Sequence, residues 1–198
     1  YKYNHSIIKF IVNNEGFILY GPDDPSHRVG IISFNVRDKT KKGQILHPNF
    51  CTVLLNDLFG IQTRAGCACA GPYGHDLFEI DEDVSNSLKV EIIEDPDIRV
   101  ENTCKDTGDC EYCNDPSMSS LKPGVCRLNV HYTLTQTEFD YILKCMNFLY
   151  EHGYKFLPQY KFTLHTGSWV HQSHLDESVD VEAGDFFFTG LESLKIGR

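Results

Sequence analysis

The strongest constraint on the fold is a helix expected between Thr135 and Gly153. Thr135 and Glu138 have the spacing of a capping box, in which each side chain accepts a hydrogen bond from the other residue's backbone amide. Apolar residues then recur at helical spacing along one side. They are Phe139, Ile142, Leu143, Met146, Leu149 and Tyr150. A helix that is apolar on one side has to pack on another layer of secondary structure.

Strands along the chain can supply that layer. Residues 29–36 are apolar enough for a central strand, and residues 126–132 alternate in the manner of a half-buried strand. Further elements are expected at 4–13 (helix), 17–20 (strand) and 47–59 (helix, with Pro48 at its start and Gly60 at its end). The order predicts a two-layer α/β sandwich, with a mixed or mainly antiparallel sheet and helices packed on one face.

Composition narrows the class of protein. With 198 residues, 41% hydrophobic and 23% charged, the chain is expected to be globular, and no apolar run is as long as a membrane span. A net charge of −10 disfavours nucleic-acid binding. Eight cysteines without a secretory signal favour a reducing, cytoplasmic environment. Because the chain opens on Tyr1, we expect it to be a piece of a longer protein.

The stretch from Ile61 to His75 combines reactive residues with backbone-bending ones. It contains Arg64, Cys67, Cys69, three glycines and a proline. This mixture disfavours a helix and predicts a strand end that runs into a loop, with a short helix at 76–80. Reactive groups are often placed on such constrained loops. Taken alone, two cysteines separated by one residue are more often small buried residues than a catalytic pair.

A polar insertion is expected at about 83–120, and an acidic extension at 166–198. Residues 89–93 could form a strand or one helical turn. The insertion contains Cys104, Cys110 and Cys113. Zinc sites usually have paired Cys-x2-Cys knuckles, and only one is present, so incidental cysteines are favoured over a metal site.

Three segments together resemble the C-terminal small domain of the class V aminotransferase family, which are fold-type-I pyridoxal-phosphate enzymes that include the cysteine desulfurases. The segments are 28–35, 55–72 and 121–129. The second matches the family's R-x-G-x-x-C-A-x-P loop at each fixed position, from Arg64 to Pro72. The resemblance covers roughly residues 4–165, and we expect residues 1–165 to form the family-like domain.

The resemblance implies a catalytic cysteine and a substrate-binding arginine. Cys69 stands in the place of the desulfurase cysteine that accepts sulfur as a persulfide, and Cys67 is the alternative nucleophile. Arg127 stands where the family has an arginine that binds the substrate carboxylate, for which a guanidinium is suited because it donates two parallel hydrogen bonds.

Three more residues are candidates for substrate binding. Arg64 could assist anion binding or orient the loop, and a structural role is equally open. Tyr73 and His75 could border the pocket, although a loop-packing role is favoured for both.

The resemblance also implies partners. Pyridoxal phosphate needs a lysine and an acidic partner. In the family both lie in a large N-terminal domain, and no lysine here has a matching context. We therefore expect the isolated chain to be inactive and to bind no cofactor. The whole enzyme, a transferase or lyase, is expected to be a homodimer that acts on a small amino acid. The rival hypothesis is a non-catalytic metal- or protein-binding module that uses the segment from Cys104 to Cys113.

Overall fold

The computed structural model describes residues 2–66, 71–93, 122–163 and 167–174. Its centre is a four-stranded sheet in the order β1-β2-β4-β3, in which every neighbouring pair is antiparallel. The strands are β1 (Phe17–Tyr20), β2 (Ile31–Val36), β3 (Arg64–Gly66) and β4 (Val125–Asn129). The prediction of a mainly antiparallel sheet with residues 29–36 in a central strand is confirmed.

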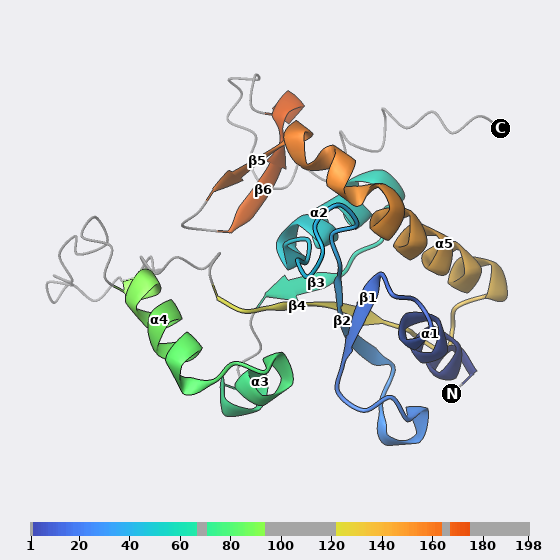
Figure 1. Cartoon of the computed structure of the whole chain (residues 1–198). Helices are drawn as coiled ribbons and strands as arrows, with labels where there is room; N and C mark the ends of the chain where they lie inside the picture. Colours follow the sequence, from blue (N-terminus) through green and yellow to red (C-terminus); the bar gives the residue numbers. More distant parts are fainter. Residues whose placement is uncertain (1, 67–70, 94–121, 164–166, 175–198) are drawn as a thin grey trace, which may run out of the picture.

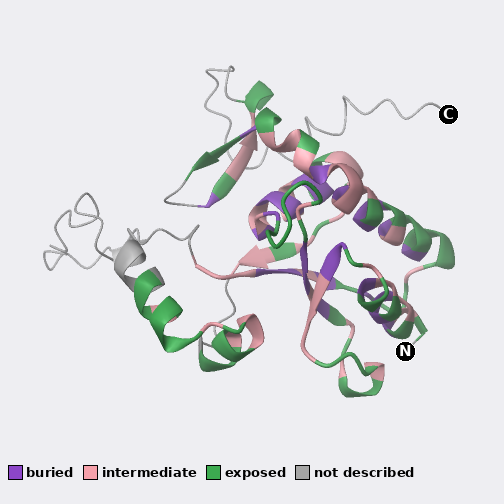
Figure 2. Ribbon diagram, viewed as in Figure 1, coloured by how far each residue is buried: buried purple, intermediate pink, exposed green. Residues whose placement is uncertain are grey.

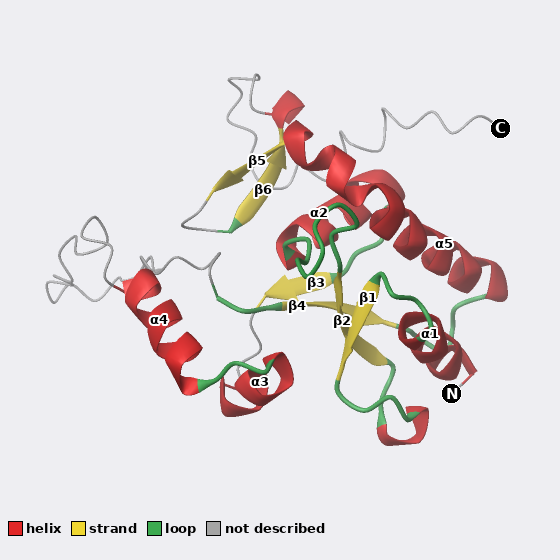
Figure 3. Cartoon of the chain, in the orientation of Figure 1, coloured by secondary structure: helices red, strands yellow, loops and turns green. Residues whose placement is uncertain are grey.

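Three helices cover one face of this sheet (Figures 1 and 3). They are α1 (Lys2–Val12), α2 (Pro48–Phe59) and α5 (Gln136–His152). Alternate residues of β2 point toward them, because Ile32, Phe34 and Val36 are fully buried in one core with residues of all three helices. Figure 2 shows the buried residues gathered between the sheet and these helices. The predicted two-layer packing is therefore present.

The ends of the two best-predicted helices show the expected caps. At the start of α5, the Glu138 amide donates to Thr135 Oγ1 at 3.2 Å and the Thr135 amide donates to Glu138 Oε2 at 2.7 Å. Helix α2 begins at Pro48 and is followed by Gly60, whose φ of 65° is easily adopted only by glycine. Local chemistry thus sets the bounds of both helices.

The structure corrects the prediction for the stretch that ends at His75. A strand is present, but the helix α3 (Gly71–Phe78) begins inside the region where a helix was not expected. Pro72 lies in the first turn of α3, where backbone N–H groups have no hydrogen-bond acceptor within the helix. Because proline lacks only this N–H group, it is compatible with the start of the helix and does not break it. Helix α4 (Glu82–Ile93) follows and includes the segment predicted as a strand or a helical turn.

The chain after α5 forms a hairpin on α2. The described residues include short 3-10 helices at Pro25–His27, Gly153–Gln159 and Gln172–His174. The second continues directly from α5, so Gly153 ends the α-helix without reversing the chain. Strands β5 (Tyr160–Thr163) and β6 (Ser168–His171) then pair, and the Trp169 ring lies 4.9 Å from the ring of Phe50. The hairpin spans the expected boundary at residue 165, and the domain division itself stays a prediction.

Across the described ranges, none of the helices combines the length and the apolar character needed to cross a bilayer.

Candidate functional site

One row of side chains crosses all four strands on the face of the sheet that the three core helices leave open. Tyr20 pairs with Ser33, Ser33 pairs with Arg127, and Arg127 pairs with Arg64. We call these four residues the cross-strand row. Successive residues of a strand point to opposite faces. Because the neighbours of Arg127, Cys126 and Leu128, are buried in the core, the row points away from it.

The structure brings two of the predicted site residues together. Arg64 and Arg127 are direct partners on neighbouring antiparallel strands, an arrangement that places their Cβ atoms about 4.5–5.5 Å apart. Arg64 is exposed and Arg127 is half-buried. Within the part of the chain that the structure describes, neither guanidinium has a hydrogen-bond or ion-pair partner. Two like charges therefore face each other on the sheet without an anionic side chain of the described residues between them.

Asn35 is a site residue that the sequence did not single out. It lies in β2, is only 1% exposed, and shares the open face with Tyr20. Its Nδ2 donates to the Tyr20 hydroxyl at 3.2 Å and to the carbonyl of Gly124 at 3.0 Å. The signal was available, because Ser33 and Asn35 are polar residues that alternate with core residues in an otherwise apolar strand.

Two glycines fix the neighbouring end of the arginine strands. Gly124 precedes β4 and lies against Gly66, the last residue of β3, so closely that a Cβ atom on Gly124 would be 2.8 Å from the Gly66 carbonyl carbon. Asn35 binds Gly124 from the other side. These contacts hold β4 between its two neighbours and so fix the register that places Arg64 opposite Arg127.

Helix α3 covers the β1 end of the row. The ring of Phe78 meets the ring of Tyr20 edge-on, with 5.1 Å between the centroids. Burial raises the pKa of Tyr20 above its ordinary value, while the hydrogen bond from Asn35 acts in the opposite direction. Tyr20 is therefore a neutral hydroxyl at physiological pH.

The same helix positions Tyr73 and His75, and both are exposed. Tyr73 lies close enough to Arg28 to influence its pKa, which burial lowers. Arg28 itself donates to the carbonyls of Pro22 and Tyr20 at 2.8 and 2.9 Å. Among the described residues, no hydrogen bond or ring contact joins Tyr73 or His75 to the two arginines of the row. Their proposed place at the substrate pocket stays a prediction.

The predicted nucleophiles Cys67 and Cys69 lie outside the described residues, and so do Cys104, Cys110 and Cys113. Their roles as a persulfide-forming loop or as metal ligands stay predictions. In the ranges that are described, no group of three or more His, Cys, Asp or Glu side chains is placed to hold a metal ion.

The described cysteines are unsuited to nucleophilic chemistry. Cys51, Cys126 and Cys145 are free thiols in the core. The Cys126 thiol donates to the carbonyl of Pro48 at 3.3 Å. A hydrogen bond with Cys126 and complete burial together raise the pKa of Cys51 well above its ordinary value. A thiolate is the reactive form, so these residues are structural.

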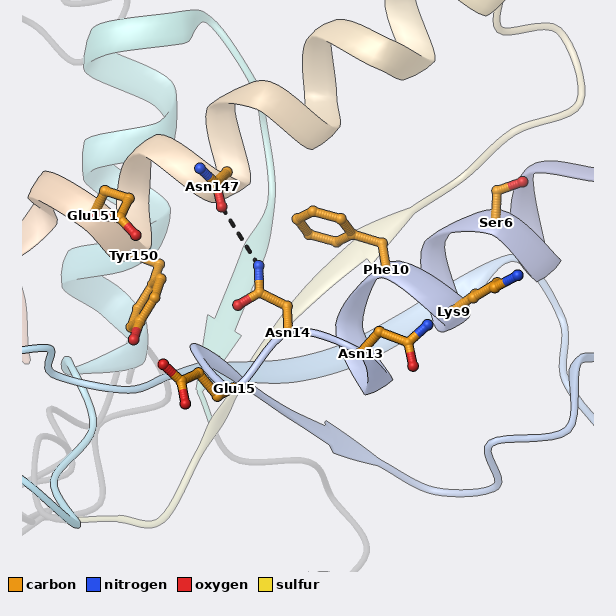
Figure 4. Close-up of a pocket in the computed structure, with 9 residues that line it drawn as sticks. All are labelled: Ser6, Lys9, Phe10, Asn13, Asn14, Glu15, Asn147, Tyr150 and Glu151. Atoms are coloured by element: carbon orange, nitrogen blue, oxygen red, sulfur yellow. Dashed lines mark hydrogen bonds between the residues drawn. The ribbon is translucent and has the colours of Figure 1, made fainter.

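Two hollows lie elsewhere on the surface. The first, of about 520 Å³, lies beside α1 and α5, where Asn14 donates to Asn147 at 3.4 Å (Figure 4). The second, of about 340 Å³, includes Arg28, Val29 and Tyr132. Neither contains a residue of the cross-strand row or any of the residues predicted for the site. Tyr20, Ser33 and Arg127 are partly exposed and Arg64 is exposed, so solvent reaches the row.

The row does not by itself fit pyridoxal phosphate. That cofactor requires a lysine amino group and an acidic partner for its ring nitrogen. The four residues of the row are a tyrosine, a serine and two arginines, and they include neither group. What the row can provide is hydrogen-bond donors for anionic oxygen atoms.

No protein-family model matches the chain, and a comparison with curated proteins found no match.

Proposed function

We propose that the chain is the C-terminal domain of a pyridoxal-phosphate enzyme of the class V aminotransferase and cysteine desulfurase group, and that it provides the arginine for the substrate carboxylate. The observation that supports this most is the position of Arg127. It lies in a central strand, on the open face, without an anionic partner among the described residues. The motif from Arg64 to Pro72, at the end of the neighbouring strand, supports the same assignment.

Arg127 is well placed to bind and orient a carboxylate. Its stem lies half-buried on the sheet, so its guanidinium loses little conformational freedom on binding. The guanidinium can donate two parallel hydrogen bonds to one carboxylate. Ser33, directly opposite on β2, offers a hydroxyl to the same group. These contacts would orient the amino acid relative to a second domain.

The cofactor would be held by a large domain on residues outside this sequence. Pyridoxal phosphate, when bound there, supplies the electron sink for bonds at the substrate's α-carbon. This chain would close over the substrate and exclude water. Cys69, with Cys67 as the alternative, would accept sulfur as a persulfide if the enzyme is a desulfurase. Aminotransferase and other lyase reactions need no such thiol, so the subclass stays open.

The test uses a protein that is extended at its N-terminus to include the large domain. It is expected to show the visible absorbance of bound pyridoxal phosphate. Arg127→Ala should raise KM for its amino-acid substrate by about 10–100-fold, because charge-assisted hydrogen bonds are lost. Lys144→Ala, which removes an exposed cation from α5 on the helix-covered side of the sheet, is the control and should leave KM unchanged.

Two outcomes would contradict the proposal. One is an extended protein that binds no cofactor, and the other is an Arg127→Ala variant with unchanged substrate affinity. The cysteine assignment has a separate readout. If cysteine is a substrate, Cys69→Ala should abolish sulfide release, and normal release would show that Cys69 is not the sulfur acceptor.

A further inference from the structure

The cross-strand row has twice the cationic charge that one carboxylate needs. We propose that Arg64 and Arg127 together bind a ligand with two anionic groups, so that the substrate class is an amino acid with a second carboxylate in its side chain. Because cysteine has one carboxylate, this substrate class selects the aminotransferase or other lyase reactions of the proposed function and not desulfuration. That this ligand is an amino acid rests on the proposed function. The binding of two anionic groups rests on the sheet geometry alone.

The row has more guanidinium donors than one carboxylate uses. One guanidinium donates a pair of hydrogen bonds to one carboxylate. If Arg127 binds the α-carboxylate, the guanidinium of Arg64 on the adjacent strand still has unused donors. A second anionic group of the ligand accepts hydrogen bonds from Arg64 and neutralises its charge. Like charges that face each other across two strands destabilise a sheet, and a dianion relieves that repulsion at both residues.

The arginine pair has no counter-ion among the described residues. The chain has 28 Asp and Glu residues against 18 Lys and Arg, so anionic side chains are abundant. Two other cationic groups have polar partners: Lys39 pairs with Glu151, and Arg28 donates to two carbonyls. In the described residues, Arg64 and Arg127 have no such partner. Both guanidinium groups are therefore available to an external anion.

The spacing between the strands that carry Arg64 and Arg127 is fixed. The contact between Gly124 and Gly66 and the hydrogen bond from Asn35 to Gly124 hold the three strands in register. The two side chains therefore start from strands about 4.8 Å apart and point to the same side. Carboxylates separated by two carbons, as in succinate or aspartate, span a comparable distance. A shorter or a singly charged ligand could use only one of the two forks.

The test is a binding titration of the 198-residue chain at low salt, with succinate and with succinamate as probes. Succinamate keeps the shape of succinate but replaces one carboxylate by an amide. Succinate is expected to bind at least about tenfold more tightly, because the second charge-assisted hydrogen-bond pair is lost with succinamate. Aspartate and asparagine should show the same order.

Variants then assign the second group to Arg64. Arg64→Gln should remove the preference for succinate while leaving succinamate affinity within about twofold, since only one fork remains. Arg127→Gln should weaken both probes, and Lys144→Gln, which removes an exposed cation from α5, should weaken neither. Circular dichroism and thermal unfolding check that each variant is folded.

The proposal is overturned if the unaltered chain binds succinate and succinamate equally, or if Arg64→Gln keeps the preference. Neither result depends on pyridoxal phosphate, whereas a failure of the extended protein to bind the cofactor would contradict only the proposed function. Aspartate binding through both arginines without cofactor binding in the extended protein would therefore separate the two proposals.

Discussion

Asn35 is the residue on which the geometry of the open face depends. Its amide joins β2 to Tyr20 on one side and to Gly124 on the other, in a position that water does not reach. Replacing it by a smaller apolar residue leaves the Gly124 carbonyl and the Tyr20 hydroxyl without this donor. A buried group that loses its partner destabilises the folded state by the cost of its desolvation.

Asn35→Ala is therefore expected to lower the free energy of unfolding by about 1–3 kcal/mol. Urea unfolding measures this. Asn13→Ala, which changes an exposed asparagine of the surface, is the matched control and should stay within about 0.5 kcal/mol. An Asn35→Ala variant as stable as this control would show that the amide does not anchor β4.

Tyr160 gives a prediction about pH. Its hydroxyl donates to Asp57 Oδ2 at 2.8 Å, and burial, followed by this carboxylate, raises its pKa well above the ordinary value. Above about pH 10 an unfolded tyrosine loses its proton while folded Tyr160 keeps it, so the stabilisation is complete below pH 10 and declines as pH rises.

Tyr160→Phe should remove this dependence. Unfolding free energies of the unaltered chain and the variant should differ by about 1–3 kcal/mol near neutral pH, and the difference should shrink above about pH 10. Tyr132→Phe, at a residue that is 83% exposed, is the control and should change little at either pH. A difference for Tyr160→Phe that grows with pH would contradict the assignment.

Single residues were predictable from the sequence where their chemistry conflicts with their surroundings. Arg127 stands out as a charge within a half-buried strand, and the motif around Arg64 identifies the second arginine. That the two are direct partners could not be predicted, because their register is set by contacts between segments far apart in the chain. Asn35 was missed because a polar residue in an apolar strand indicates a polar face but does not reveal which groups its side chain binds.

At the scale of elements, the junction of β3 and β4 determines how the arginines are presented. Gly124 and Gly66 approach so closely that no side chain fits between them. The atoms that an added Cβ would meet belong to the Gly66 backbone, which cannot move aside as a flexible side chain would. A Cβ atom on Gly124 has to push the two strands apart.

Gly124→Ala is expected to lower the free energy of unfolding by about 1–3 kcal/mol, the usual cost of overpacking, and to weaken succinate binding by at least about tenfold. Gly74→Ala is the matched control. It lies in α3, the nearest atom to an added Cβ is 3.8 Å away, and alanine should stabilise the helix by about 0.5–1 kcal/mol. Unchanged succinate affinity in Gly124→Ala would show that the register does not control the site.

The predicted bounds of elements were accurate where side chains or glycine cap the helix. Helices α2 and α5 begin and end within a residue or two of their expected positions, because Pro48, Gly60 and the capping box act locally. A short helix was expected only from residue 76, and α3 begins earlier, at Gly71, because glycine and proline were treated as helix breakers irrespective of position. In the first turn, proline is compatible with a helix.

At the scale of the whole molecule, the core helices lie on one face of the sheet. Helices α1, α2 and α5 and the hairpin account for the core, whereas, among the described helices, α3 contacts the row at its β1 end (Figure 1). The two-layer architecture was predictable because amphipathic helices and alternating strands leave few ways to bury their apolar sides. The position of the hairpin on α2 was not, because aromatic contacts such as that of Trp169 with Phe50 join distant segments.

This asymmetry is the basis of the functional account. The hollows beside α1 and at the end of β4 are lined by other residues, so an anion could bind there without involving either arginine of the row. The central claim is that anionic ligands bind on the open face of the sheet. It concerns the location of binding, which affinities alone do not establish.

The most direct test is a nitrogen-15 NMR titration of the chain with succinate. The account predicts that the largest shifts occur at the Nε–H groups of Arg64 and Arg127 and at the backbone amide of Ser33, and that those of Arg64 and Ser33 are much smaller in the Arg127→Gln variant at the same succinate concentration. Shifts confined to the hollow beside α1 and α5, or the absence of shifts anywhere in the sheet, would contradict it.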